Sequence, residues 1–176
     1  MKVKFNNQVL PAILALFVLS SVASVQAATN TGNMTVTANV ETACTVSASP
    51  MAFGTVIPGA VKETTATITS NCTTGTPYTV NLGDGLNHTV DGGPAGGLYR
   101  RQMAATTFLL PYVIYIDAAR TTEIGATAVA LNNLLTTTLG TGANSDVMIY
   151  GRIKAAETGG QEPGSYIDTV VVTIGF

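Results

Sequence analysis

Few residues in this chain combine in a way that could do chemistry. A Ser-His-Asp nucleophile would need His88, the one histidine, which lies in a glycine- and asparagine-rich stretch, and no GxSxG motif surrounds any serine. Two pairs of carboxylates are close enough in sequence for a two-acid hydrolase. They are Asp84 with Asp91 and Glu157 with Glu162. Both pairs lie in expected loops, where acids are usually solvated, so the sequence predicts no enzyme and no catalytic residue.

Ligand and cofactor motifs are equally weak. Asp84, Asn87 and Asp91 are hard oxygen ligands that suit calcium, but their spacing matches no known calcium loop. The glycine-rich stretch from 83 to 97 lacks the GxxxxGK[ST] pattern of a phosphate-binding loop. Arg100-Arg101 can be read as a ligand patch, but two charges at a strand start are more typical of a solvated edge. We therefore expect no metal, no cofactor and no small-molecule substrate.

Cys44 and Cys72 are the two cysteines. Their spacing is not CxxC and the chain has one histidine, which argues against a zinc site. In an oxidising compartment the default is one disulfide, and two buried free thiols are the alternative. A bond between them would close a loop of about 29 residues, to which the chain-entropy model assigns roughly 3–4 kcal/mol.

The N-terminus reads as a secretory signal peptide, residues 1–27. Lys2 and Lys4 precede an apolar run from Val9 to about Val22, and Val25-Gln26-Ala27 fits the small-x-small cleavage rule. A membrane anchor is the alternative, but the run is short, contains a proline, and no charged stop follows. Cleavage after residue 27 leaves 176 − 27 = 149 residues, enough for one domain with a real core.

The net charge of the chain argues against some classes of binding partner. Without Lys2 and Lys4 the chain keeps 8 − 2 = 6 basic residues against 10 acidic ones, a net charge of −4. That balance argues against nucleic acid and anionic membranes as partners. Only 10% of all residues are charged, and a surface so poor in charge tolerates close association or is covered by a partner.

The pattern of apolar residues predicts an all-β domain. No helical periodicity is sustained, and apolar runs of strand length are separated by Gly, Pro, Asn or Asp, as in a sandwich or barrel. The expected strands cover residues 44–48, a short piece at 51–56, then 62–72, 78–82, 110–117, 146–154 and 164–176. Residues 118–145 stay open, because Val129, Leu131, Leu134 and Leu135 fit a short strand or a helical turn.

The two ends of the mature chain alternate most clearly. In the last thirteen residues, Gly164–Phe176, which we call the terminal segment, one face holds Tyr166, Val170, Val172, Ile174 and Phe176, interrupted by Asp168. Near the start, Met34, Val36, Ala38 and Val40 share one face of Asn30–Val40, which we call the donor segment. The sequence stops inside the terminal strand, so another segment is expected to pair with its far edge. The donor segment fits, either folded back on its own domain or supplied by another copy.

Four blocks of the chain carry a resemblance to a known family. They are CTVSASPMAFGTV, NCTTGTPYTVNL, LPYVIYIDAARTTEIG and YGRIKAAETGGQEPGSYIDTVVVTIGF. Together they resemble the spore coat protein U domain family, and more closely the major pilin subunits of archaic (Csu-type) chaperone–usher pili. The resemblance runs from Cys44 to Phe176. Ile124 departs from it, since an aromatic residue is expected before that glycine.

The resemblance implies an incomplete immunoglobulin-like sandwich that lacks its last strand and is completed by donor-strand exchange. A periplasmic chaperone first fills the cleft, and an outer-membrane usher then replaces the chaperone strand with the N-terminal segment of the next copy. Carried over here, residues 1–27 are the signal peptide, 28–43 carry the donor strand and 44–176 form the pilin domain. The Cys44–Cys72 pair matches the family's disulfide.

The same resemblance implies roles for the alternating residues. Met34, Val36, Ala38 and Val40 would enter the cleft of a neighbouring copy. The cleft edge and the contact with the chaperone would be formed by Tyr166, Val170, Val172, Ile174 and Phe176. The expected function is a pilus subunit at the cell surface, exported through the periplasm and serving adhesion and biofilm formation. The alternative is a secreted β-sandwich module that binds a carbohydrate or a surface without entering a fibre.

Overall fold

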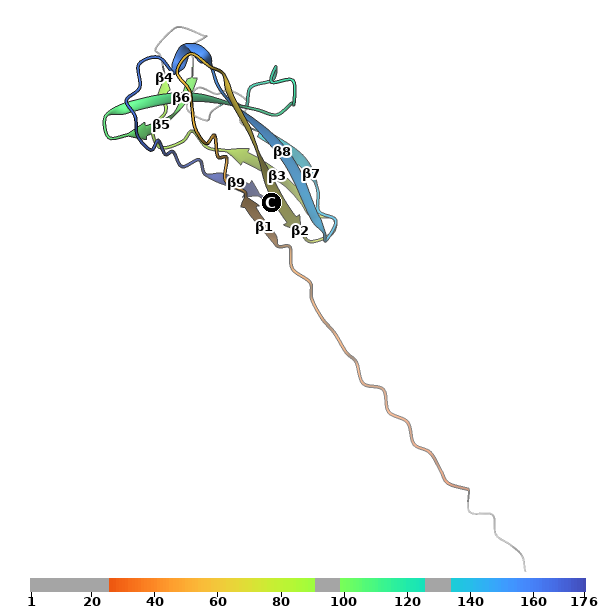
Figure 1. Cartoon of the computed structure of the whole chain (residues 1–176). Helices are drawn as coiled ribbons and strands as arrows, with labels where there is room; N and C mark the ends of the chain where they lie inside the picture. The colour runs from red at the N-terminus through yellow and green to blue at the C-terminus, as the bar shows by residue number, and fades with distance from the viewer. Residues whose placement is uncertain (1–25, 91–98, 126–133) are drawn as a thin grey trace, which may run out of the picture. The chain divides into compact units, whose positions relative to one another are not determined.

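The computed structural model describes residues 26–90, 99–125 and 134–176 (Figure 1). The chain divides into two compact units, Met1–Ala38 and Asn39–Phe176. The described part of the first unit, residues 26–38, contains no helix or strand and is exposed throughout. No helix in the described ranges is long and apolar enough to span a membrane.

The second unit is built from two antiparallel sheets, which confirms the all-β prediction. Its strands are β1 (Cys44–Ala48), β2 (Lys62–Cys72), β3 (Pro77–Leu82), β4 (Thr89–Val90), β5 (Tyr99–Ala105), β6 (Phe108–Tyr115), β7 (Leu134–Leu139), β8 (Asn144–Ile153) and β9 (Val172–Gly175), with a 3-10 turn η2 (Ala155–Glu157) after β8. Within the described residues the sheet orders are β1-β2-β8-β6-β5-β4 and β7-β3-β9. The core lies between the inner faces of these sheets.

The pairing of β2 with β8 forms the centre of the larger sheet. Ladder partners run from Lys62 opposite Ile153 to Asn71 opposite Asn144. Inward positions of β2 hold Ala66, Ile68, Ser70 and Cys72, all buried. The outward positions between them are threonines and an asparagine, which suit a pleated, half-solvated surface. Period-two alternation thus decides which face of β2 meets the core.

The disulfide joins β1 to this centre. Cys44 and Cys72 lie directly opposite each other in the ladder between β1 and β2, with their Cα atoms 4.1 Å apart. Their bond confirms the predicted pairing. It ties the first residue of an edge strand to the last residue of its neighbour, so β1 cannot separate from β2 at that end.

Several strand predictions needed correction. Strand β5 was missed, although it forms a hairpin with β6 through a turn in which Thr106 takes a φ of 54°. The expected short strand at 51–56 is irregular, although Phe53 is buried. The expected strand 110–117 places Tyr112, Ile114 and Ile116 on one face, but at its end Tyr115 is buried and Ile116 is exposed. Twist and the end of pairing with β8 at Tyr115 break the alternation.

In the open region 118–145, Leu134–Leu139 forms β7, which pairs with β3. The strand alternative was therefore the right one for Leu134 and Leu135. Val129 and Leu131 lie outside the described residues. Ile124, where an aromatic residue was expected, is buried in the core at 1% exposure, so an aliphatic side chain fills that position here.

Arg101 on β5 overturns the expectation of a solvated charge. Its side chain is 1% exposed. The guanidinium donates to the carbonyl of Gly83 at 3.1 and 3.0 Å, to that of Ile124 at 2.8 Å and to that of Gly125 at 2.8 Å. A planar fork of donors suits such convergent acceptors. Arg101 therefore ties the loop after β3 to residues 124–125. Its neighbour Arg100 pairs with Glu157 at 2.7 Å.

Replacing Arg101 with methionine should lower the free energy of unfolding by about 3 kcal/mol, because three backbone carbonyls lose a charged donor. Urea denaturation would measure the change. Arg152→Met is the matched control: Arg152 pairs with the partly exposed Glu63 at 2.7 Å, and such a pair contributes about 0–1 kcal/mol. Equal losses in the two variants would contradict a special role for Arg101.

The loop after β6 is closed by one carboxylate. Asp117 accepts hydrogen bonds from the backbone N–H groups of Thr121 (3.0 Å) and Thr122 (2.6 Å) and from the Thr121 hydroxyl (2.9 Å). The backbone hydrogen bond from Thr121, followed by that from Thr122, lowers the pKa of Asp117 from 3.8 to about 2. Arg120, at a φ of 56°, completes the turn and pairs with Glu63 at 3.2 Å.

The lowered pKa predicts how this loop responds to acid. Between these two pKa values the Asp117 carboxyl is more often ionised in the folded chain than in the unfolded chain. Asp117 therefore stabilises the fold above pH 3.8, and this stabilisation is lost as the pH falls towards about 2. Asp117→Asn should therefore be less stable than the wild type at pH 6, and the difference should shrink at pH 2. Urea midpoints at both values test this, and a difference that stays constant would contradict it.

Candidate functional site

Two edge strands from different sheets lie beside each other in the second unit. β1 ends the order of the larger sheet and β9 ends that of the smaller one, and the two are neighbours in space (Figure 1). Most inward side chains of the central strands are buried, although Val147 of β8 is half-buried, whereas those along these two edges are half-buried throughout or nearly so. The half-buried set comprises Cys44, Val46, Tyr166, Val170, Val172 and Ile174. The core is therefore least covered between β1 and β9.

A cavity of about 280 Å³ lies next to this position, where β1 ends and β9 begins. One wall is formed by Ala48, Ser49, Met51 and Phe53, at and after the end of β1. The opposite wall is the stretch 166–172, and the floor includes Ile68, Tyr112, Ile114 and Ile149 from the larger sheet. We call this cavity the groove. A second cavity of about 670 Å³ lies between residues 51–58 and 158–166 and shares Met51, Phe53, Met103 and Tyr166 with the groove.

The terminal segment crosses from one sheet to the other as it passes the groove. Ile167 exchanges two backbone hydrogen bonds with Ala104 of β5, at 2.9 and 3.0 Å. Four residues later the carbonyl of Val171 accepts from the N–H of Gly83 at 2.7 Å, and β9 then pairs with β3. The strand expected over 164–176 is therefore confined to Val172–Gly175, because a segment that changes sheets cannot keep a single ladder partner.

Side chains of the terminal segment alternate as the sequence indicates. Tyr166, Asp168, Val170, Val172 and Ile174 are half-buried, while Ile167, Thr169, Val171 and Thr173 are exposed. Phe176 is 63% exposed. The alternation persists beyond the short ladder of β9, so the inward row faces the groove even where the backbone is not paired.

Asp168 anchors this row. Its Oδ2 accepts from the Tyr112 hydroxyl at 2.6 Å, and its Oδ1 accepts from the N–H groups of Leu86 and Thr169, both at 2.8 Å. The carboxylate thus links β6, the loop after β3 and the terminal segment. Gly85, at a φ of 84°, makes room for it, because a Cβ there would collide with Asp168 Oδ2. The crossover is held in place by a charge-assisted network.

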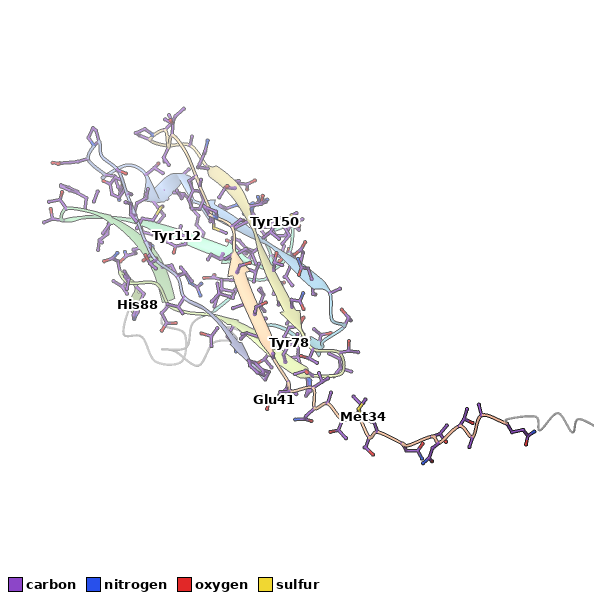
Figure 2. The ribbon with its side chains drawn as sticks, turned by 90° about the horizontal axis from the view of Figure 1, so that it is seen from below. Met34, Glu41, Tyr78, His88, Tyr112 and Tyr150 are labelled. Atoms are coloured by element: carbon purple, nitrogen blue, oxygen red, sulfur yellow. A yellow bond between two sulfur atoms is a disulfide. The ribbon has the colours of Figure 1, made fainter. Side chains whose placement is uncertain are left out.

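The donor segment has no strand and its apolar side chains are exposed. Met34 is 84%, Val36 78% and Val40 80% exposed, and Ala38 is exposed as well. Figure 2 shows Met34 on a stretch drawn without strand arrows. The residues predicted to enter a cleft therefore present their apolar atoms to water, which is costly for large side chains.

Three of the residues first considered for chemistry make contacts of other kinds. His88 is an exposed loop residue whose Nδ1 lies 3.0 Å from the carbonyl of Gly85. Glu157 pairs with Arg100, and Glu162 contributes its backbone carbonyl to the Tyr166 hydroxyl at 2.8 Å. Asp91, part of the calcium alternative, lies outside the described residues. Over the ranges that the structure covers, no three His, Cys, Asp or Glu side chains cluster as metal ligands.

Comparison with known proteins adds to this geometry. The model of the Spore Coat Protein U domain matches residues 30–173. Protein U of Myxococcus xanthus is 31% identical over 176 residues, covering 94% of this chain and 95% of that protein. The chain belongs to the Spore Coat Protein U domain family.

A solved structure matches the fold. It is a chaperone–tip adhesion subunit pre-assembly complex, CsuC–CsuE, from the archaic chaperone-usher Csu pili of Acinetobacter baumannii. The TM-score is 0.54 at 22% identity, and the match covers 78% of this chain. The chain spans 40% of the length of the matched chain. This likeness agrees with an immunoglobulin-like sandwich for the family member described here.

Sequence reasoning missed part of the groove. Met51 and Phe53 were placed in a strand, and Met103 lies on the unrecognised β5. Tyr112 lies in the strand expected over 110–117, but its hydrogen bond to Asp168 was not predicted. The sequence held one sign of this hydrogen bond. Asp168 interrupts an apolar row, and a charged side chain in such a row requires hydrogen-bond donors nearby.

Tyr112→Phe tests the anchor directly. Loss of a hydroxyl that donates to a carboxylate should lower the free energy of unfolding by about 2 kcal/mol. Amide hydrogen exchange at Leu86 and Thr169, which share Asp168 as acceptor, should accelerate. Tyr166→Phe is the control, because that hydroxyl donates to an exposed backbone carbonyl. Unchanged exchange at both amides in the Tyr112 variant would rule out the anchoring role.

Proposed function

We propose that this protein is a structural subunit of an extracellular pilus, assembled by donation of an N-terminal strand into the groove of the next copy. The observation that carries the proposal is the open groove where β1 ends and β9 begins. Its lining includes Ala48 from β1, Val172 from β9 and the half-buried Tyr166, Asp168 and Val170 of the terminal segment. The family membership and the chaperone-bound structural neighbour, itself a pilus subunit complex, support the same function.

The donor segment has the alternating pattern of a strand that could cover the groove. Its eleven residues would span about 36 Å when extended, at roughly 3.3 Å per residue. Burying Met34, Val36 and Val40 at about 1.5–3 kcal/mol each gives on the order of 5–9 kcal/mol before ladder hydrogen bonds are counted. Ordering the segment offsets part of this gain. A strand placed between β1 and β9 would pair with both edges and close the sandwich.

The arrangement also explains the form of the assembly. The donor and acceptor surfaces of one copy are different, so the contact is heterologous and its repetition gives an open fibre. Before assembly the groove needs a temporary strand, which we assign to a periplasmic chaperone contacting the terminal segment up to Phe176. An outer-membrane usher then exchanges it for the next copy. The resulting pilus serves attachment to surfaces and biofilm formation.

Deleting Asn30–Val40 should leave a subunit that still binds its chaperone but forms no fibres. Val36→Asp should have nearly the same effect, because the charge would enter an apolar groove at a cost of several kcal/mol. Thr37→Asp is the matched control, since Thr37 lies on the opposite face of the donor segment. Electron microscopy of surface fibres and co-purification with the chaperone are the two measurements.

Fibres formed by the deletion variant would show that strand donation is wrong. Equal assembly of Val36→Asp and Thr37→Asp would show that the alternating face does not enter a groove. Chaperone binding in both variants excludes the trivial explanation that the domain has not folded.

A further inference from the structure

The groove wall contains one carboxylate, Asp168, between Tyr166 and Val170 on the inward row. Most of the other lining side chains are apolar. Three donors hold the carboxylate in place, two on Oδ1 and one on Oδ2. A carboxylate oxygen accepts about two hydrogen bonds, so Oδ2 can accept one more.

Covering the groove removes water from Asp168. The carboxylate cannot turn away, because Tyr112 and the N–H of Leu86 bind it from two other elements. An ionised group that loses water without gaining a donor is strongly unfavourable. Any strand that fills the groove is therefore favoured when it places a hydrogen-bond donor, rather than an apolar side chain, opposite Asp168.

The lengths of the two apolar rows then define a register. Beyond Asp168 the alternation continues over four apolar positions: the half-buried Val170, Val172 and Ile174, and the exposed Phe176. The donor segment also has four: Met34, Val36, Ala38 and Val40. Its row is flanked two residues away by Gly32 and by Thr42. Matching four positions with four therefore places one of these two residues opposite Asp168.

We propose that Asp168 sets the register of the donated strand by accepting a hydrogen bond from the Thr42 hydroxyl of the neighbouring copy. This inference rests on the proposed function. The donated strand runs antiparallel to β9, with Val40 opposite Val170 and Val36 opposite Ile174. The opposite direction would place Gly32 at Asp168, and glycine has no side-chain donor. The ladders among the described strands are likewise antiparallel.

Cross-linking on the exposed face tests the register without altering Asp168. The antiparallel register places Asn39 opposite Val171, whereas the parallel one places Thr35 there. Both donor positions and Val171 are exposed in the free subunit. The mature chain carrying Asn39→Cys with Val171→Cys, treated with a short thiol cross-linker, should give a ladder of covalent multimers on a denaturing gel. Thr35→Cys with Val171→Cys should give monomers.

Substitution of Thr42 tests the hydrogen bond itself. In Thr42→Val, fibres should dissociate about tenfold faster in denaturant, because a buried carboxylate loses a donor. Thr42→Ser keeps the hydroxyl and should restore the wild-type dissociation rate. Equal dissociation rates for the Thr42→Val and Thr42→Ser fibres would overturn the assignment of Thr42. If Thr42 acted through packing alone, the valine variant would not dissociate faster than the serine variant.

The outcomes separate this inference from the proposed function. A ladder from the Thr35 pair alone overturns the register while leaving strand donation intact. Fibres that give no ladder with either pair also overturn it. A wild-type mature chain that forms no head-to-tail multimers, even when its chaperone and usher are supplied, refutes the proposed function as well.

Discussion

Unpaired strand edges are the constraint on which this structure depends. Backbone N–H and C=O groups along a sheet edge, and the apolar side chains beside them, are satisfied only when another strand lies against them. β2 and β8 pair with each other over nearly their whole length, and each has a further partner along part of its other edge. β1 and β9 are paired on one side only, and the groove opens where β1 ends and β9 begins.

Buried polar side chains hold the parts of the chain that cannot be held by ladders. Arg101 gathers the carbonyls of Gly83, Ile124 and Gly125, and Asp168 gathers donors from three segments around the crossover. Both side chains form hydrogen bonds with polar backbone groups of irregular segments, as a neighbouring strand does with those of a regular strand. Each is favourable because its partners converge on one charged group. Asp168 holds the terminal segment at the groove although β9 is only four residues long.

Much of the fold follows from local pattern. The alternation of β2, the strand character of Cys44–Ala48 and the pairing of the cysteines were predictable, because each depends on neighbours in sequence or on redox environment. The terminal strand was overestimated, since alternation reports which face is inward but not how far a ladder partner extends. β5 was missed because Arg100 and Arg101 look solvent-exposed in sequence. Only the distant carbonyls of residues 83, 124 and 125 reveal why a guanidinium is buried there.

The disulfide has a mechanical consequence for a fibre. The donor segment is joined to its own domain at Ala43, one residue before Cys44. In the proposed head-to-tail fibre, tension would enter each domain at the start of β1, where hydrogen bonds loaded one at a time would peel apart. The covalent link to Cys72 passes that load directly to β2, the longest strand among those described, and from there to the full ladder with β8. In such a fibre the disulfide would thus protect the hydrogen bonds of β1 from being broken one after another.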